Sequence, residues 1–68
     1  MTDTGLRVLR LMNDGNARRV PTIAKGIGKC QRVTRATVLG CIVSGLIEQV
    51  AGSPGLFQIT DAGRDALP

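Results

Sequence analysis

The spacing of apolar residues changes along this chain, and each change marks an expected element. Between residues 4 and 12, apolar side chains recur every three or four positions, which predicts an amphipathic helix. Residues 13–16, Asn-Asp-Gly-Asn, form a strong stop and turn signal after it. Residues 17–20 are expected to be a short connection, because Val20 precedes a proline and is pushed away from helical backbone angles.

Two further helices with a tight turn between them are expected next. Pro21 suits a first helical turn, where its missing N–H costs nothing, and a helix is predicted over residues 21–27. Gly28 can then take the positive φ that a sharp turn needs. A longer helix is predicted over residues 31–44, and Gly45 fits the left-handed position that ends such a helix. Its two faces hold Thr34, Val38 and Cys41 on one side, and Arg32, Arg35 and Leu39 on the other.

The last third of the chain predicts a hairpin followed by a short helix. Residues 46–50 are apolar and partly alternating, so they are expected to form a strand. Residues 52–55, Gly-Ser-Pro-Gly, supply the turn, and residues 56–59 supply the returning strand. A threonine and an aspartate then cap a helix over residues 62–67. The expected fold is α+β and mainly α, in a single domain spanning residues 1–68.

Two motifs in these elements resemble winged helix-turn-helix transcription regulators of bacteria and their phages. The first runs from Ile-Ala-Lys at residues 23–25, through Gly28 and the Thr-Val-Cys helix face, to Gly-Leu-Ile at residues 45–47. The second, Phe-Gln-Ile-Thr-Asp-Ala-Gly-Arg at residues 57–64, is similar to wording common in MarR-like and PadR-like regulators. The resemblance implies three helices, a two-stranded hairpin wing and a short C-terminal helix. It also implies that the second helix of the motif presents its N-terminal half to the major groove of double-stranded DNA.

The resemblance assigns contacts with bases to that half of the helix. Arginine can pair with guanine O6 and N7 through two hydrogen bonds, and glutamine can pair with adenine in the same way. Arg32 and Arg35 are three positions apart, so both can project into one groove. The residues expected to contact bases are Gln31, Arg32, Val33, Arg35 and Ala36. The alternative is that these are ordinary solvated side chains on a surface helix.

Cationic and polar residues near the start of the motif suit phosphate groups, because such contacts set position rather than sequence. A helix N-terminus can also accept a phosphate through its backbone amides. The expected phosphate-contacting residues are Arg18, Arg19, Thr22, Lys25 and Lys29. Ser53 and Gln58 are the polar candidates on the wing. The alternative is a basic patch that serves only solubility.

A group of apolar residues departs from the family pattern. Leu39, Ile42 and Val43 fall on the side of the long helix where such regulators usually carry charged residues. Both sides of that helix cannot pack inside so small a domain, and an exposed apolar patch marks an interface. We expect a homodimer that forms through this helix, the first helix or the last one. A second possibility is a winged-helix module that binds another protein through this patch instead of binding DNA.

The charge of the chain agrees with an acidic partner. Nine basic residues against five acidic residues give a net charge of +4, and the isoelectric point is near 10.1. Such an excess fits nucleic acid, although a plain soluble surface could carry it too. A chain of 68 residues buries only about 60% of its unfolded surface, so a second subunit would add needed stability.

Several functions are disfavoured by what the sequence lacks. It has no histidine, no glycine-rich phosphate loop with its lysine and no tight group of carboxylates, so no enzyme is expected. Two cysteines without histidine do not make a zinc site, and no metal or cofactor is expected. Phe57 is the sole aromatic residue, which disfavours single-strand binding by stacking. A chain of this size has little room for a pocket of roughly a few hundred Å³.

The expected surroundings follow from the ends of the chain and its longest apolar stretch. No stretch of about 18 apolar residues is present, so no membrane partner is expected. The first residues have no basic region followed by an apolar run, so no secretory signal is expected and the cytoplasm is the expected compartment. No sensor segment is appended to the domain, so no small-molecule effector is indicated.

Overall fold

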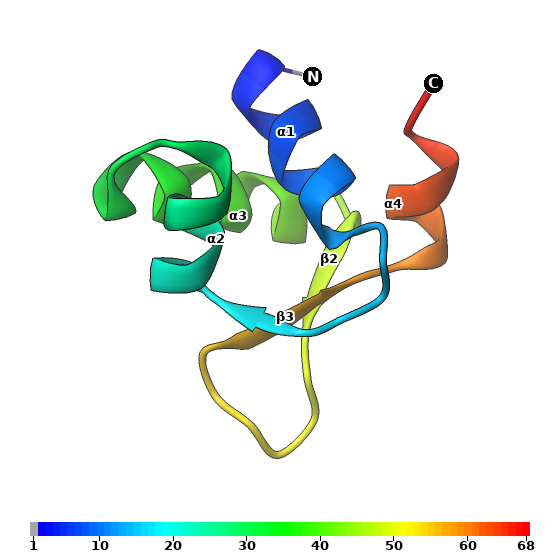
Figure 1. The fold of residues 1–68 in the computed structure, drawn as a ribbon. Helices are drawn as coiled ribbons and strands as arrows, with labels where there is room; N and C mark the ends of the chain where they lie inside the picture. Colours follow the sequence, from blue (N-terminus) through cyan, green and yellow to red (C-terminus); the bar gives the residue numbers. More distant parts are fainter. Residues whose placement is uncertain (1) are drawn as a thin grey trace.

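The computed structural model describes residues 2–68, which form four helices and a three-stranded sheet (Figure 1). The helices are α1 (Asp3–Met12), α2 (Val20–Ile27), α3 (Gln31–Val43) and α4 (Asp61–Asp65). The strands are β1 (Arg18–Arg19), β2 (Ile47–Gln49) and β3 (Leu56–Ile59). The predicted class, a mainly helical α+β winged helix-turn-helix, is confirmed. Each expected helix and hairpin strand is present with ends that differ by no more than about two residues from the prediction. The helix α2 includes Val20, which was expected to lie outside it because it precedes a proline.

The sheet contains a strand that the sequence did not reveal. β3 lies in the middle, with β1 and β2 paired antiparallel on its two sides. Within β1, Arg18 lies opposite Phe57 and Arg19 lies opposite Leu56. Two adjacent arginines carry no apolar alternation, so their pairing depends on where α1 and α2 place this connection. The expected two-stranded hairpin wing is present as β2 and β3, and β1 extends it to a three-stranded sheet.

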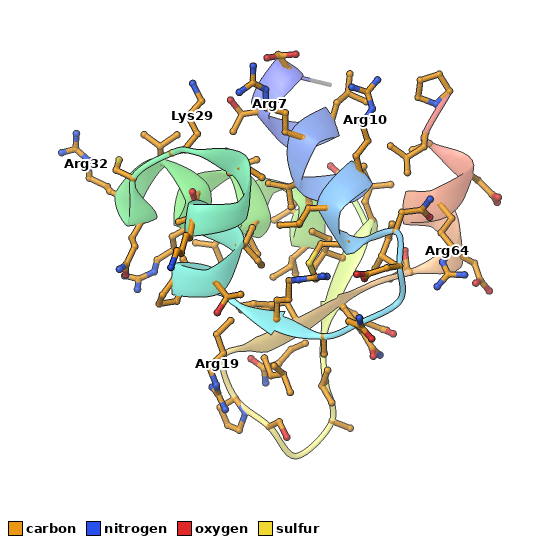
Figure 2. The ribbon with its side chains drawn as sticks, in the orientation of Figure 1. Arg7, Arg10, Arg19, Lys29, Arg32 and Arg64 are labelled. Atoms are coloured by element: carbon orange, nitrogen blue, oxygen red, sulfur yellow. The ribbon has the colours of Figure 1, made fainter. Side chains whose placement is uncertain are left out.

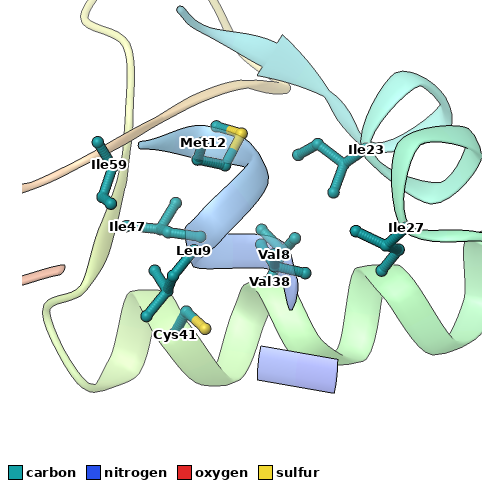
Figure 3. Close-up of a cluster of buried hydrophobic side chains, with 9 residues drawn as sticks. All are labelled: Val8, Leu9, Met12, Ile23, Ile27, Val38, Cys41, Ile47 and Ile59. Carbon is teal, nitrogen blue, oxygen red and sulfur yellow. The ribbon is translucent and has the colours of Figure 1, made fainter. Parts of the chain in front are cut away.

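The hydrophobic core lies where α1, α2 and α3 meet the sheet (Figure 3). Its buried members are Val8, Leu9, Met12, Ile23, Ile27, Val38, Cys41, Ile47 and Ile59. The predicted inward face of α3 is confirmed, because Thr34, Val38 and Cys41 are all buried. Burial raises the pKa of the Cys41 thiol, which suits a small uncharged core group. Since one stripe of side chains anchors α3, the opposite side of this helix remains exposed.

The turn between α2 and α3 depends on Gly28. This residue has a φ of 71° and a left-handed conformation, as predicted. Its N–H group and that of Lys29 both donate to the carbonyl oxygen of Ala24, which ends α2 and redirects the chain. Lys29 is exposed just after the turn, so its charged side chain remains in solvent.

The short helix α4 is held closely against the chain that leads into β2. The Thr60 hydroxyl donates to the carbonyl oxygen of Gly45 at 2.7 Å, and the Thr60 N–H donates to that of Leu46 at 3.1 Å. The same hydroxyl accepts a hydrogen bond from the Gly63 N–H at 3.0 Å. Gly63 is buried at this contact, and a methyl group there would collide with the Leu46 carbonyl oxygen and the Ile59 side chain. Gly63 is therefore required by close packing.

Candidate nucleic-acid interface

The first two turns of α3 present the residues that the sequence assigned to base contacts. Gln31, Arg32, Val33, Arg35 and Ala36 are all exposed. Thr34, which lies among them in sequence, is fully buried and fixes this part of the helix to the core. In Figure 2 the side chain of Arg32 extends away from the body of the molecule. The helix surface needed for contact with a duplex is thus open to solvent.

The four helices differ in how their N-termini are capped. The hydroxyls of Thr2 and Thr60 accept backbone N–H bonds at the starts of α1 and α4, and each helix has an aspartate in its first turn. Neither α2 nor α3 has a side-chain cap or an acidic residue in its first turn. Uncapped N–H groups carry the positive end of the helix dipole and favour an anion. The two helices of the helix-turn-helix motif therefore have N-termini suited to phosphate.

A groove of about 430 Å³ lies between α3, the start of α2 and the wing. Arg19 and Arg35 line it, with apolar residues between them that include Val20, Pro21 and Phe57. Arg19 also donates from Nη1 to the carbonyl oxygen of Pro54 in the wing turn at 3.1 Å, which ties the wing to β1. The fold thus brings Arg19 and Arg35, which are distant in sequence, to the same concave surface.

Arg18, one of the expected phosphate-contacting residues, makes its bonds within the domain. Its guanidinium makes two hydrogen bonds to Asp14, with Nη1–Oδ1 and Nη2–Oδ2 distances of 2.9 and 2.6 Å. It also donates to the carbonyl oxygens of Leu11 and Asn16, and only 18% of its side chain is exposed. These bonds close the turn after α1. Both Nη atoms of Arg18 are occupied by these bonds, which makes Arg18 a weaker candidate for a phosphate contact than Arg19.

The same pair predicts how stability depends on pH. The hydrogen bonds from the Arg18 side chain, followed by that from the Asn16 N–H, hold the pKa of Asp14 well below its ordinary value. A carboxyl group whose pKa is lowered on folding stabilises the fold above its unfolded pKa, and this contribution is lost as pH falls toward the folded pKa. We expect the melting temperature to fall between about pH 5 and about pH 2. Asp14→Asn should have a lower melting temperature at neutral pH and a smaller acid-induced decrease, measured by circular dichroism. Equal decreases for both proteins would contradict this assignment.

The remaining polar candidates lie at different places around α2 and the wing. Thr22, Lys25 and Lys29 are exposed, and Figure 2 shows Lys29 at the same end of the molecule as Arg32. In the wing, the Gln58 amide donates to Glu48 Oε1 at 2.9 Å. The backbone of Ser53 closes the turn through bonds with Val50 and Leu56. The wing residues thus take part in bonds within the hairpin itself.

The three apolar residues assigned to an interface do not share one environment. Ile42 is half-buried and packs against the core. Leu39 is 53% exposed and lines the groove beside Arg35. Val43 is 89% exposed at the end of α3. The expected patch is thus divided between the core, the groove and the C-terminal end of the helix.

The rest of the described surface adds a second groove of about 600 Å³ between the start of α1 and α3. Small residues, including Gly5, Ala36 and Gly40, line it. The expectation that so short a chain has little room for concave sites was therefore wrong. Within residues 2–68, no three histidine, cysteine or acidic side chains are grouped to hold a metal ion. No helix in this same range has the length and apolar character to cross a membrane.

Comparison with solved structures finds the same fold in transcription regulators. A MarR family transcriptional regulator from Silicibacter pomeroyi DSS-3 is 26% identical, with a TM-score of 0.87 over 96% of this chain and 48% of that chain. The transcriptional repressor CouR, bound to p-coumaroyl-CoA, is 27% identical, with a TM-score of 0.83 over 98% of this chain and 48% of that chain. BpsR from Bordetella bronchiseptica is 20% identical, with a TM-score of 0.85 over 96% of this chain and 48% of that chain. No protein-family model matches the sequence, and comparison with curated proteins finds no match.

These neighbours confirm the predicted resemblance to winged helix-turn-helix regulators, and they are regulators rather than enzymes. They contradict the expectation about small-molecule effectors. DNA binding by BpsR is regulated by 6-hydroxynicotinic acid, and CouR is bound to p-coumaroyl-CoA. That expectation relied on the lack of an appended sensor segment. This chain spans about half the length of these proteins, at 48% of each, so the lack of a sensor segment in it does not bear on whether an effector binds.

Proposed function

We propose that this chain binds double-stranded DNA sequence-specifically and acts as a small transcriptional regulator, in the manner of a repressor. The observation that carries the proposal is the exposed N-terminal half of α3, with Arg32 and Arg35 on a helix that the core holds from its other side. The solved structures with the same fold include a transcriptional regulator and a transcriptional repressor at 26% and 27% identity.

In this proposal the exposed residues of α3 contact bases in the major groove. Arg32 and Arg35 pair with guanine, and Gln31 pairs with adenine. Each two-bond arginine–guanine pair contributes about 1–3 kcal/mol of discrimination against other bases. A major groove about 12 Å wide admits one helix, so the first turns of α3 can approach the base edges.

Contacts with phosphate groups come from both ends of α2, the turn before α3 and the groove beside the wing, since Lys25 lies in the last turn of α2 rather than near its start. The proposed cations are Arg19, Lys25 and Lys29, and Thr22 lies in the uncapped first turn of α2. The positive ends of α2 and α3 add to these charges, since neither first turn contains an acidic residue. Ser53 and Gln58 remain candidates for weaker contacts from the wing.

Self-association as a homodimer is the second part of the proposal. Val43 is 89% exposed at the C-terminal end of α3, away from the proposed base-contacting turns. An exposed valine at the edge of a thin core is suited to pack against a second copy. Sedimentation at micromolar concentration should give twice the mass of the chain, and a mass equal to one chain would contradict the dimer.

Salt dependence tests the DNA-binding proposal directly. Binding to a random-sequence duplex is measured by fluorescence anisotropy at several salt concentrations. Three phosphate-contacting cations predict a slope of about −3 in a plot of log affinity against log salt, at about −0.9 per contact. Absence of binding at low salt would overturn the proposal. It would favour instead a module that binds protein through Leu39 and Val43, the exposed large apolar residues of the second half of α3.

A further inference from the structure

Val33 and Ala36 lie among the exposed residues of α3 that are expected to contact bases, but neither side chain can form a hydrogen bond with a base. Arg32, Ala36 and Leu39 follow one line along the helix, at the spacing of residues on a single face. Val33 is 41% exposed in the same first turns. An exposed valine side chain forms no hydrogen bonds with water, and valine is a weaker helix former than the charged residues that usually occupy such positions. A partner that covers the arginines would also cover these apolar groups.

We infer that Val33 and Ala36 bind the 5-methyl groups of thymine, so that the preferred duplex contains thymine beside guanine. The inference rests on the proposed DNA-binding function and specifies the bases that it reads. In the major groove, thymine is distinguished by this methyl group, which small apolar side chains contact. The position of the two residues favours DNA over protein as the partner, because they share the first two turns with Arg32 and Arg35.

The polar groups of α3 also favour guanine and thymine, because none of them is a carboxylate that could recognise cytosine. Cytosine is read by a carboxylate that accepts from its N4 amine, and α3 contains no acidic residue. Of its two threonines, Thr34 is fully buried, and the Thr37 hydroxyl donates to the Val33 carbonyl oxygen at 3.0 Å. The donors left on the outward side come from Gln31, Arg32 and Arg35. The guanidinium donors and small apolar groups of this surface complement guanine and thymine, and the Gln31 amide, which both donates and accepts, is available for adenine.

Replacing thymine by deoxyuridine tests the inference, because it removes only the methyl group. Preferred duplexes are first selected from a random pool with the full chain, and each thymine is then replaced singly. At one or two positions we expect affinity to fall about fourfold, which corresponds to about 0.8 kcal/mol for one buried methyl-sized group. Val33→Ala should bind the thymine duplex more weakly and lose the sensitivity to deoxyuridine at one of these positions. Its melting temperature should be no lower than that of the wild type, because the side chain is partly exposed and alanine is the better helix former.

The outcomes separate this inference from the function on which it depends. Tight binding that requires Arg32 and Arg35 but does not change with deoxyuridine at any position would overturn thymine recognition and leave DNA binding intact. Equal sensitivity to deoxyuridine in the wild type and in Val33→Ala and Ala36→Ser would overturn the assignment to these side chains. Failure to select any duplex would overturn both proposals.

Discussion

Gly63→Ala is expected to lower the melting temperature by about 15 °C. The added methyl group would collide with the Leu46 carbonyl oxygen, which is part of the backbone and also accepts from Thr60. Overpacking against groups that cannot move costs about 3 kcal/mol, and about 1 kcal/mol corresponds to roughly 4–8 °C in a domain this small. The free energy of unfolding is typically near 0.1 kcal/mol per residue, so this short chain can lose only a few kcal/mol before it unfolds. Thermal unfolding followed by circular dichroism gives the measurement.

A matched control for this substitution lies in α3. Gly40 is also helical, but a methyl group there meets no atom within 4 Å. Gly40→Ala should therefore raise the stability by up to about 1 kcal/mol through better helix propensity. If both substitutions changed the melting temperature by the same amount, the close contact between α4 and the chain before β2 would not explain why Gly63 is needed.

The second large effect is expected in DNA binding. Arg32→Ala combined with Arg35→Ala should weaken binding to a selected duplex by about 100-fold, because each arginine–guanine pair contributes about 1–3 kcal/mol. Both side chains are exposed, so the fold should be unaffected. The loss should be much smaller on a random duplex, since phosphate contacts supply most of the non-specific binding. Fluorescence anisotropy on the two duplexes measures both values.

Two arginines of α1 provide the control for charge. Arg7 and Arg10 have the same three-residue spacing as the α3 pair, and Figure 2 shows them on a different part of the molecule. Replacing both with alanine removes the same total charge. We expect affinity for the selected duplex to change by about threefold or less, because distant exposed charges are screened by salt. Equal losses from the two double variants would mean that only net charge matters, and base contact by α3 would be refuted.

The main elements of this fold could be predicted because each has a local cause. Apolar residues repeat along α1 and α3, and the buried face of α3 follows from that repeat. The turn after α2 and the end of α3 depend on glycines, Gly28 and Gly45, which both adopt positive φ as predicted. Thr60 indicated the start of α4, because a threonine hydroxyl can accept a hydrogen bond from a backbone N–H in the first turn of a helix. Such signals act over a few residues and can be read without coordinates.

What could not be predicted depends on contacts between distant segments. The strand β1 exists because Arg18 and Arg19 meet β3 across the sheet, whereas the local pattern indicated a short connection and gave no strand partner for it. Asp14 and Arg18 are four positions apart in the sequence, and they form an ion pair. The turn expected at residues 13–16 gave no reason to predict that their side chains meet. The groove that brings Arg19 to Arg35 joins segments from three parts of the chain. Charge alone suggested the same role for Arg18 and Arg19, and only the three-dimensional structure separates them.

The placement of β3 between two partners also determines how the hairpin can move. Because β1 leads directly into α2, and because Arg19 bonds to the Pro54 carbonyl oxygen, the hairpin is attached to the helical body at the first two residues of β3 and at the wing turn. A hairpin attached in this way cannot swing about a single hinge at its base. If the domain binds DNA as proposed, a tilt of the hairpin toward the duplex would shift the first turn of α2 as well. Shape adaptation and positioning of the helical pair are therefore mechanically linked in this domain.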